Sequence, residues 1–344
     1  MDNKKKALVL GGTGVMGTYL VNELLDMGFS VDAACAHHKI SAIENLNYLF
    51  GNFLDYHEIR KFLRGKHYDV IVDFMTYSTA KFSERFDLLL SSSEQYIFLS
   101  SYRVYSDTEI PTKESSPKLL DVTDDIEFLN GDDYSLFKAR EENILRNSKF
   151  RNWTIVRPAI TYSSRRVAFV TLELPLMLRR SAAGKPIYIP KNVWNTQATC
   201  TWAGDVARMI SKLVLNPAAI CEDFSVCTSE HHTWGEIAAI YNELLGADIH
   251  TVSMQDYVSF FGGNYSKGML DYDRCLNRIM DNSKILRITG MKQNDLLPLK
   301  DGITKAVAQA KENSSSWPGY TLLYEVDKAM DRYYQTNIVT EGSK

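Results

Sequence analysis

Short apolar runs alternate with stretches of helical periodicity through the first half of the chain. Residues 7–10 are apolar and follow three lysines, which is typical of a buried parallel strand that begins at a charged end. Later apolar runs predict further strands, and the stretches between them predict helices. The predicted strands are 30–36, 70–74, 96–99 and 153–156, and the predicted helices are 54–64, 81–90 and 133–147. This alternation predicts an α/β fold with helices on both faces of a parallel sheet.

The pattern changes in the second half of the chain. Residues 106–132 are rich in Pro, Asp, Ser and Thr, and predict a long loop. The alternation of strands and helices ends near residue 164, so we predict a first domain over 1–163, to which some later segments return, and a smaller lobe over 164–344. We expect this lobe to cover the carboxyl edge of the sheet, where doubly wound folds bind their ligands.

Glycines recur every three residues directly after the first strand. Gly11, Gly14 and Gly17 are followed by an amphipathic stretch, which places them between a strand and a helix. Glycine permits a tight turn, close approach of a pyrophosphate to the backbone, and close packing of the helix on the strand. Free N–H groups and the positive dipole end of the helix favour phosphates at this point. The pattern favours a dinucleotide-binding unit over an ordinary strand–helix turn.

Two further groups of polar residues are candidates for catalysis. Tyr134 and Lys138 lie four residues apart in a predicted helix, so they share one face of it. A cation that close favours the phenolate form of a tyrosine, which can act as a base; the alternative is an ordinary surface pair. Ser100 and Ser101 follow the strand predicted over 96–99. A serine there can hydrogen-bond a reacting hydroxyl or carbonyl, or it can simply cap the next segment.

Composition and charge narrow the class of protein. The chain has 344 residues and a net charge of −3, which gives no support for binding nucleic acid or a membrane surface. Its five cysteines show no metal-ligand spacing, so we expect no metal site and the reduced thiols of a cytoplasmic protein. No apolar run approaches the ~20 residues of a membrane span.

Together these motifs resemble the extended short-chain dehydrogenase/reductase family, which contains NAD-dependent epimerases, dehydratases and reductases of nucleotide sugars. The resemblance implies a Rossmann-type doubly wound parallel sheet with a smaller C-terminal substrate-binding lobe, NAD or NADP as cofactor, a nucleotide sugar as substrate, and a homodimer. It rests on the glycine triplet, on Tyr134 with Lys138, on the Ser-Ser-x-x-Val-Tyr segment 100–105, on Arg157-Pro158, and on segments 205–207 and 281–284.

The resemblance also implies a role for each motif residue. Tyr134 would be the general acid or base on a sugar hydroxyl, and Ser101 would match the family's catalytic Ser or Thr. Lys138 would hold the nicotinamide ribose and favour the tyrosine's phenolate, while hydride passes between a sugar carbon and the nicotinamide. The implied cofactor contacts are Gly11, Thr13, Gly14, Val15, Met16, Gly17, His37, Asn52, Phe53, Met75, Lys138, Pro158 and Ile160.

One departure from the family pattern concerns the choice of cofactor. NAD-specific members usually have an acid at the end of the second strand, where it binds the ribose 2′-hydroxyl. Here that place is occupied by Cys35 and Ala36, and the next three residues are His37, His38 and Lys39. The missing acid, and the basic residues that follow, favour NADP; the alternative is that the paired histidines are simply solvated loop residues.

Other departures concern the reaction. Dehydratases of the family carry an Asp-Glu pair after the catalytic Ser or Thr, whereas this chain has Tyr102 and Arg103, which argues against dehydration. The Arg with which many epimerases bind the diphosphate is replaced by Ala198. Arg274 or Arg278 could bind a phosphate in its place, or could be a surface charge.

The leading hypothesis is an NAD(P)-dependent sugar epimerase, which acts through a keto intermediate with Tyr134 as acid and base. An NADP-dependent ketosugar reductase or dehydrogenase is the alternative. A non-catalytic dinucleotide-binding sensor or an RNA-associated protein is the alternative from another class, against which the presence of Ser101, Tyr134 and Lys138 argues. The sequence does not determine the sugar, the nucleotide or the carbon that reacts.

Overall fold

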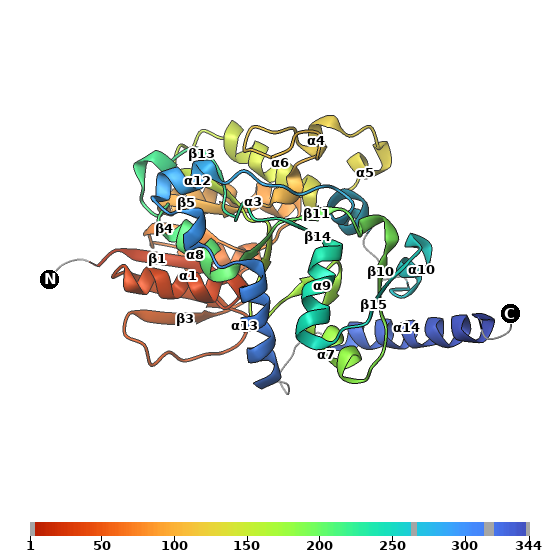
Figure 1. Cartoon of the computed structure of the whole chain (residues 1–344). Helices are drawn as coiled ribbons and strands as arrows, with labels where there is room; N and C mark the ends of the chain where they lie inside the picture. Colours follow the sequence, from red (N-terminus) through yellow and green to blue (C-terminus); the bar gives the residue numbers. More distant parts are fainter. Residues whose placement is uncertain (1–3, 263–266, 313–319, 342–344) are drawn as a thin grey trace. The chain divides into compact units, whose positions relative to one another are not determined.

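The computed structural model describes residues 4–262, 267–312 and 320–341, which form two compact units (Figure 1). Unit 1 comprises Met1–Thr161, Cys200–Ser229 and Met280–Leu297. Unit 2 comprises Tyr162–Thr199, Glu230–Ile279 and Pro298–Lys344. Each unit is therefore built from three separate segments of the chain.

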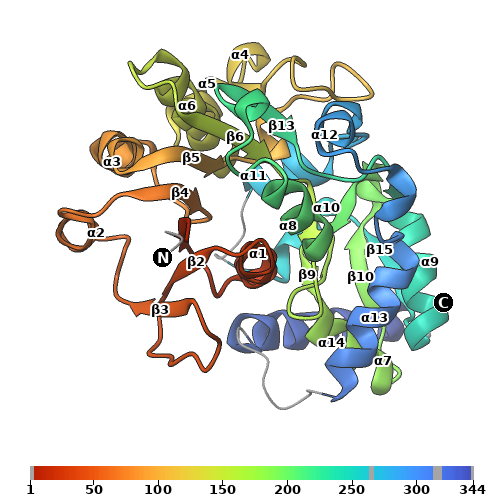
Figure 2. The same cartoon turned by 90° about the vertical axis from the view of Figure 1, so that its left-hand side faces the viewer.

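Unit 1 contains a parallel sheet of seven strands in the order β13-β6-β5-β4-β1-β2-β3 (Figure 2). The prediction of a doubly wound parallel sheet is confirmed. The strands are β1 (Lys6–Leu10), β2 (Ser30–Cys35), β3 (Leu46–Phe50), β4 (Tyr68–Asp73), β5 (Ser93–Leu99), β6 (Trp153–Arg157) and β13 (Glu222–Ser225).

Helices cover both faces of this sheet because side chains alternate along each strand. Ala7 and Val9 of β1 belong to a core with residues of helices α1 and α8, whereas Leu8 and Leu10 belong to a second core with residues of α2, α3 and α6. The helices of unit 1 are α1 (Val15–Asp26), α2 (Tyr56–Leu63), α3 (Thr79–Ser91), α4 (Leu119–Val122), α5 (Ile126–Asn130), α6 (Tyr134–Asn147), α8 (Ala203–Ser211) and α12 (Ser283–Thr289), with short 3₁₀ turns at Tyr102–Val104, Pro217–Ala219 and Gln293–Asp295.

Unit 2 is mainly helical and contains small two-stranded sheets, one of which pairs β10 with β15 in parallel. Thr233 caps α9, and the carboxylate of Glu236 accepts from the backbone N–H of Thr233 at 2.7 Å. Its longer elements are α7 (Leu174–Ala182), β10 (Ile187–Pro190), α9 (Trp234–Leu245), β15 (Ile249–Val252), α10 (Met254–Ser259), α13 (Leu299–Glu312) and α14 (Tyr320–Glu341). Its shorter elements are β8 (Ala168–Phe169), β9 (Leu172–Glu173), β11 (Gln197–Ala198), β14 (His232–Thr233), α11 (Lys267–Met269) and the turns Lys191–Val193 and Leu270–Arg274. Two further short strands, β7 (Ile160–Tyr162) and β12 (Cys200–Trp202), lie at positions in the sequence where the chain passes from one unit to the other.

Several predicted elements differ from the observed ones. The segment 106–132 is not a continuous loop, because α4 and α5 lie within it. Asp133 precedes α6 as its N-cap, with its carboxylate accepting from the N–H of Ser135 at 3.0 Å. Strands β3 and β13 were not predicted, and they form the two edges of the sheet.

Candidate functional site

The glycine loop joins β1 to α1 at the carboxyl edge of the sheet. Gly11 has a φ of +77°, a backbone conformation that favours glycine. A Cβ on Gly17 would overlap the carbonyl oxygen of Gly11 and lie 2.9 Å from the Cα of Gly12, so no larger residue fits. Helix α1 begins at Val15, and the N–H groups of its first turn point out of the helix end. This cradle fits a pyrophosphate.

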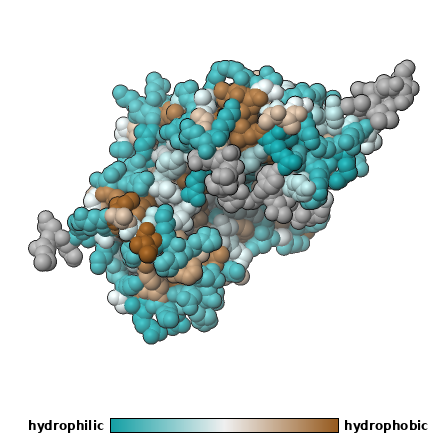
Figure 3. Space-filling view, turned by 90° about the horizontal axis from the view of Figure 1, so that it is seen from below, coloured by the Kyte–Doolittle hydropathy of each residue, from teal (hydrophilic) through white to brown (hydrophobic). Residues whose placement is uncertain are grey.

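A cavity of about 410 Å³ opens beside the glycine loop. Five of the predicted cofactor contacts line it, namely Gly11, Thr13, Asn52, Phe53 and Met75. The side chain of Phe50 is 62% exposed and that of Leu54 is 40% exposed, so this rim offers apolar surface to a planar base. On the face of the molecule in Figure 3, apolar residues lie in separate spots among hydrophilic ones.

The end of β2 contributes residues that the sequence analysis did not assign as contacts. Ala34, Cys35 and Ala36 line the cavity together with Phe50, Gly51 and Leu54. His37 lies outside this lining, although the thiol of Cys35 donates to its carbonyl oxygen at 3.1 Å. Among the described residues of the lining, none carries a charge. The cavity therefore offers no acid for a ribose 2′-hydroxyl.

Ser101, Arg103 and Tyr134 are brought together at the carboxyl end of β5. The Ser101 hydroxyl oxygen accepts from the N–H of Arg103 at 3.2 Å and so caps the turn Tyr102–Val104. The guanidinium of Arg103 lies 5.0 Å from the centre of the Tyr134 ring, and 3.6 Å from the carboxylate of Asp133. The capping role considered for Ser101 is thus present, and the same contacts hold its segment against the half-buried Tyr134.

Pro158 lies beside the same segment. Its carbonyl oxygen accepts from the N–H of Tyr102 at 3.1 Å. Ser100 cannot take the place of Ser101, because it is fully buried and its hydroxyl donates to Glu142 at 2.5 Å. The backbone after β6 and the turn after β5 therefore form one surface. Val15, Met16, Lys138, Pro158 and Ile160 do not line the cavity beside the glycine loop.

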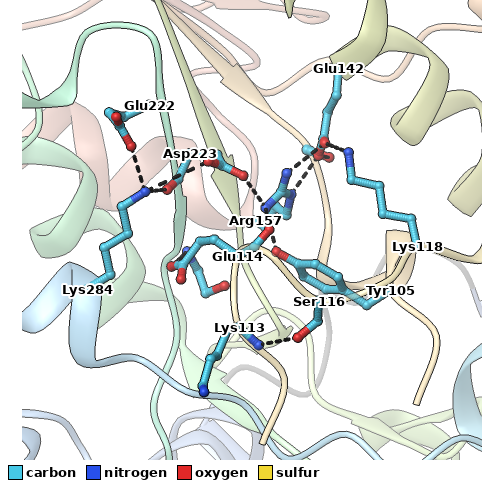
Figure 4. Close-up of polar contacts among 12 residues, drawn as sticks. Tyr105, Lys113, Glu114, Ser116, Lys118, Glu142, Arg157, Glu222, Asp223 and Lys284 are labelled. Carbon is cyan, nitrogen blue, oxygen red and sulfur yellow. Dashed lines mark hydrogen bonds and ion pairs between the residues drawn. The ribbon is translucent and has the colours of Figure 1, made fainter. Parts of the chain in front are cut away.

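A buried ionic network lies next to this surface, around Arg157 at the end of β6 (Figure 4). Arg157, at the end of β6, pairs with Glu142 at 2.7 Å and with Asp223 of β13 at 2.6 Å, and it also contacts the hydroxyl of Tyr105. Lys118 binds the second oxygen of Glu142 at 2.7 Å. Burial alone would raise the pKa of Glu142, but the charges and hydrogen bonds of Arg157 and Lys118 outweigh it and hold the pKa at about 2. Glu142 is therefore ionised at neutral pH.

Lys138 lies one turn after Tyr134 in α6, as its spacing predicts. Its side chain is fully buried, and its ammonium lies 3.0 Å from the carboxylate of Glu141 and 4.5 Å from the ring centre of Phe98. Neither Glu141 nor Glu142 was singled out by the sequence analysis. The signal that the sequence offered was their spacing, because Glu141 and Glu142 lie three and four residues after Lys138 in the same predicted helix.

The arginines proposed as phosphate ligands lie in unit 2. Arg274 is 8% exposed and Arg278 is 2% exposed, so neither is a surface charge. Arg274 contacts Asp273 and donates to the carbonyl of Val170 at 2.8 Å, and Arg278 donates to the carbonyl of Tyr272 at 3.0 Å. Among the described residues, no three His, Cys, Asp or Glu side chains are grouped as metal ligands. No helix in the described part of the chain is long and apolar enough to cross a membrane.

A model of the NAD dependent epimerase/dehydratase family matches residues 7–227. The search of curated proteins returned no match.

Solved structures resemble the chain at low sequence identity. The epimerase Mth375 of Methanothermobacter thermautotrophicus has a TM-score of 0.70 at 16% identity, over 90% of this chain and 93% of that one. The Bordetella bronchiseptica enzyme WbmG, in complex with NAD and UDP, has a TM-score of 0.68 at 16% identity, over 91% and 97% of the two chains. A UDP-glucose 4-epimerase of Thermotoga maritima, solved with UDP-glucose, has a TM-score of 0.64 at 17% identity, over 90% and 100%. These similarities show a shared fold.

Proposed function

Because the chain belongs to the NAD dependent epimerase/dehydratase family, we propose that it is an NAD(P)-dependent epimerase that acts on a nucleotide-linked sugar through a keto intermediate. Family membership makes it an enzyme of the NAD-dependent epimerase or oxidoreductase type, which leaves no support for a purely non-catalytic sensor. WbmG was solved with NAD and UDP, and the Thermotoga enzyme with UDP-glucose. These complexes support a nucleotide-linked substrate.

The observation that carries the proposal is the contact between Arg103 and Tyr134. It holds the Ser101 turn and the start of α6 together, at the sheet edge where the glycine loop also ends. When bound, the dinucleotide supplies a carbon that accepts hydride and returns it. Tyr134 takes the proton from the sugar hydroxyl and later gives it back, and Ser101 donates a hydrogen bond to the sugar oxygen. Arg103 stands where dehydratases carry an acid, so the chain has no carboxylate there for dehydration.

The nucleotide that the purified protein retains tests this proposal. An epimerase returns its hydride to the same sugar, so its cofactor stays bound through the cycle. We expect denaturation of the purified protein to release near-stoichiometric NAD, identified by chromatography. A protein that is purified empty and then binds NADPH would contradict the epimerase, and would favour the ketosugar reductase. A protein that binds neither nucleotide would contradict both.

The uncharged lining at the end of β2 favours the reductase as a second candidate. NADP carries a 2′-phosphate, which an acid at this position would repel and which Lys39 could bind. The ammonium of Lys39 lies 4.4 Å from the ring centre of Tyr48.

Replacement of Ala36 by aspartate tests the cofactor preference. We expect Ala36→Asp to raise the affinity for NAD relative to NADP roughly ten- to hundredfold, because a hydrogen bond to a charged group contributes about 1.5–3 kcal/mol. Both dissociation constants are measured by fluorescence titration of the reduced nucleotides. Ala36→Ser, which adds a polar group without charge, is the control. An unchanged ratio in Ala36→Asp would show that this position does not face the ribose.

The expected homodimer stays a prediction. Sedimentation of the purified protein at micromolar concentration is its direct test.

A further inference from the structure

Lys138 has an unusual neighbour for a residue that is expected to meet a cofactor. Its side chain and that of Glu141 are both fully buried, and the ammonium nitrogen lies 3.0 Å from Oε2 of Glu141. The two residues lie three positions apart in α6, so their side chains meet on the same face of the helix. An ammonium has three N–H donors, and this contact occupies one of them.

A second carboxylate lies near the same ammonium. Asp73, at the end of β4, is 1% exposed, and its charge acts on both Lys138 and Glu141. Both of its oxygens already accept hydrogen bonds, from the N–H of Met75 at 2.9 Å and from the hydroxyl of Tyr96 at 2.9 Å, with Tyr77 as a further donor at 3.1 Å. Glu141 differs from Asp73 in this respect. No described residue donates to its Oε1, although that atom is buried.

The charged groups of the surrounding elements are committed to other partners. Arg85 of α3 lies 4.5 Å from the ring centre of Tyr77 and donates to the carbonyl oxygens of Phe53 and Leu54. Asp132, before α6, binds Thr79 and Arg140. The core of the cluster is therefore one cation, Lys138, with two carboxylates, Asp73 and Glu141.

When both acids are ionised, Asp73, Glu141 and Lys138 together carry a net charge of −1. A net charge is unfavourable in a buried site. Burial raises the pKa of both acids, and that of Glu141 reaches about 7 in spite of the opposing effect of Lys138. Glu141 also has the buried oxygen that lacks a donor, so it can take up a proton without breaking a hydrogen bond of Asp73.

We propose that Glu141 holds the ammonium of Lys138 in the free protein, and that binding of the dinucleotide draws the ammonium away from Glu141, which then takes up a proton from solvent. This inference rests on the proposed role of Lys138. The buried ammonium must turn toward the ribose in order to donate to it, because its side chain is 0% exposed. A carboxylate left without its partner in a buried site is strongly unfavourable, and protonation of Glu141 removes that charge.

Calorimetry of NAD binding to the protein freed of its nucleotide, in buffers of different ionisation enthalpy, tests the proposal directly. At pH 8 nearly all of Glu141 is ionised in the free protein, so we expect the wild type to take up close to one proton per NAD bound. By linkage, its dissociation constant should rise by up to about tenfold per pH unit above about 7. In Glu141→Gln, which keeps an oxygen acceptor without the charge, both the uptake and the pH dependence should be lost. Glu127→Gln, an exposed acid of α5, is the control and should behave as the wild type.

Two variants separate failure of this inference from failure of the proposed function. If Lys138→Met binds NAD as tightly as the wild type, the proposed role of Lys138 is wrong. If Lys138→Met weakens binding but Glu141→Gln still takes up the proton, only the role of Glu141 is wrong. Absence of proton uptake in the wild type itself would overturn the inference without any variant, so the test does not depend on the folding of Glu141→Gln.

Discussion

Replacement of Tyr134 by phenylalanine is expected to lower turnover by roughly 10²- to 10⁴-fold, which is the contribution typical of a general acid or base. The substitution removes only the hydroxyl and keeps the ring on which Arg103 lies. Binding of NAD should therefore change by less than about twofold. Turnover is measured by chromatography of the product from a nucleotide sugar that the wild type converts, beginning with UDP-glucose, and binding is measured by titration.

Tyr56 provides a matched control for this prediction. It is the first residue of α2 and follows the N-cap Asp55, just as Tyr134 is the first residue of α6 and follows the N-cap Asp133. Both tyrosines are half-buried. Tyr56→Phe should leave turnover unchanged. If Tyr134→Phe retained activity similar to that of Tyr56→Phe, Tyr134 would not be the acid or base.

Replacement of Arg157 by methionine is expected to destabilise unit 1 by about 3–5 kcal/mol at pH 7, as measured by urea unfolding. The side chain of Arg157 is fully buried, and its loss takes the guanidinium away from the carboxylates of Glu142 and Asp223 (Figure 4). Glu222→Gln removes a half-exposed partner of Lys284 from the same network, and should change stability by less than about 1 kcal/mol. Equal small effects of the two variants would contradict a supporting role for Arg157.

The effect of Arg157→Met should also depend on pH in a defined direction. The pKa of Glu142 is about 2 in the folded protein, against 4.5 for a glutamate that is free of these partners and exposed, as in the unfolded chain. A lowered pKa stabilises the fold at any pH above about 4.5, and this contribution is lost as the pH falls toward about 2. The difference between wild type and Arg157→Met should therefore shrink over this range. A constant difference down to pH 3 would show that the ion pair with Glu142 is not its source.

Features encoded within a few neighbouring residues could be predicted from the sequence. Gly11 and Gly14 lie between β1 and α1 as their spacing indicates, Gly17 lies in the first turn of α1, and Tyr134 and Lys138 share α6. These predictions succeed because the glycine turn and the helical spacing are local properties of the backbone.

The missed features depend on residues far apart in the chain. Strand β3 reads Leu-Asn-Tyr-Leu-Phe and was not predicted, and only Leu46 of its five residues is buried. Phe50 was missed with it as part of the cavity rim. Strand β13 reads Glu-Asp-Phe-Ser, and its acids are matched by Arg146 and Lys284, which are distant in sequence. Asp73 comes close to Lys138 only because α6 packs beside β4 and β5, which no local pattern reveals.

The division of unit 1 into three segments has a consequence for how the protein can be made. Strand β13 and helix α8 come from residues 200–229, and α12 and the turn Gln293–Asp295 come from 280–297. Until these residues have left the ribosome, one edge and much of one face of the sheet expose apolar side chains such as Val156 and Ile97. The nucleotide-binding half therefore cannot complete its core during synthesis of the first 161 residues, and a fragment that ends there should aggregate.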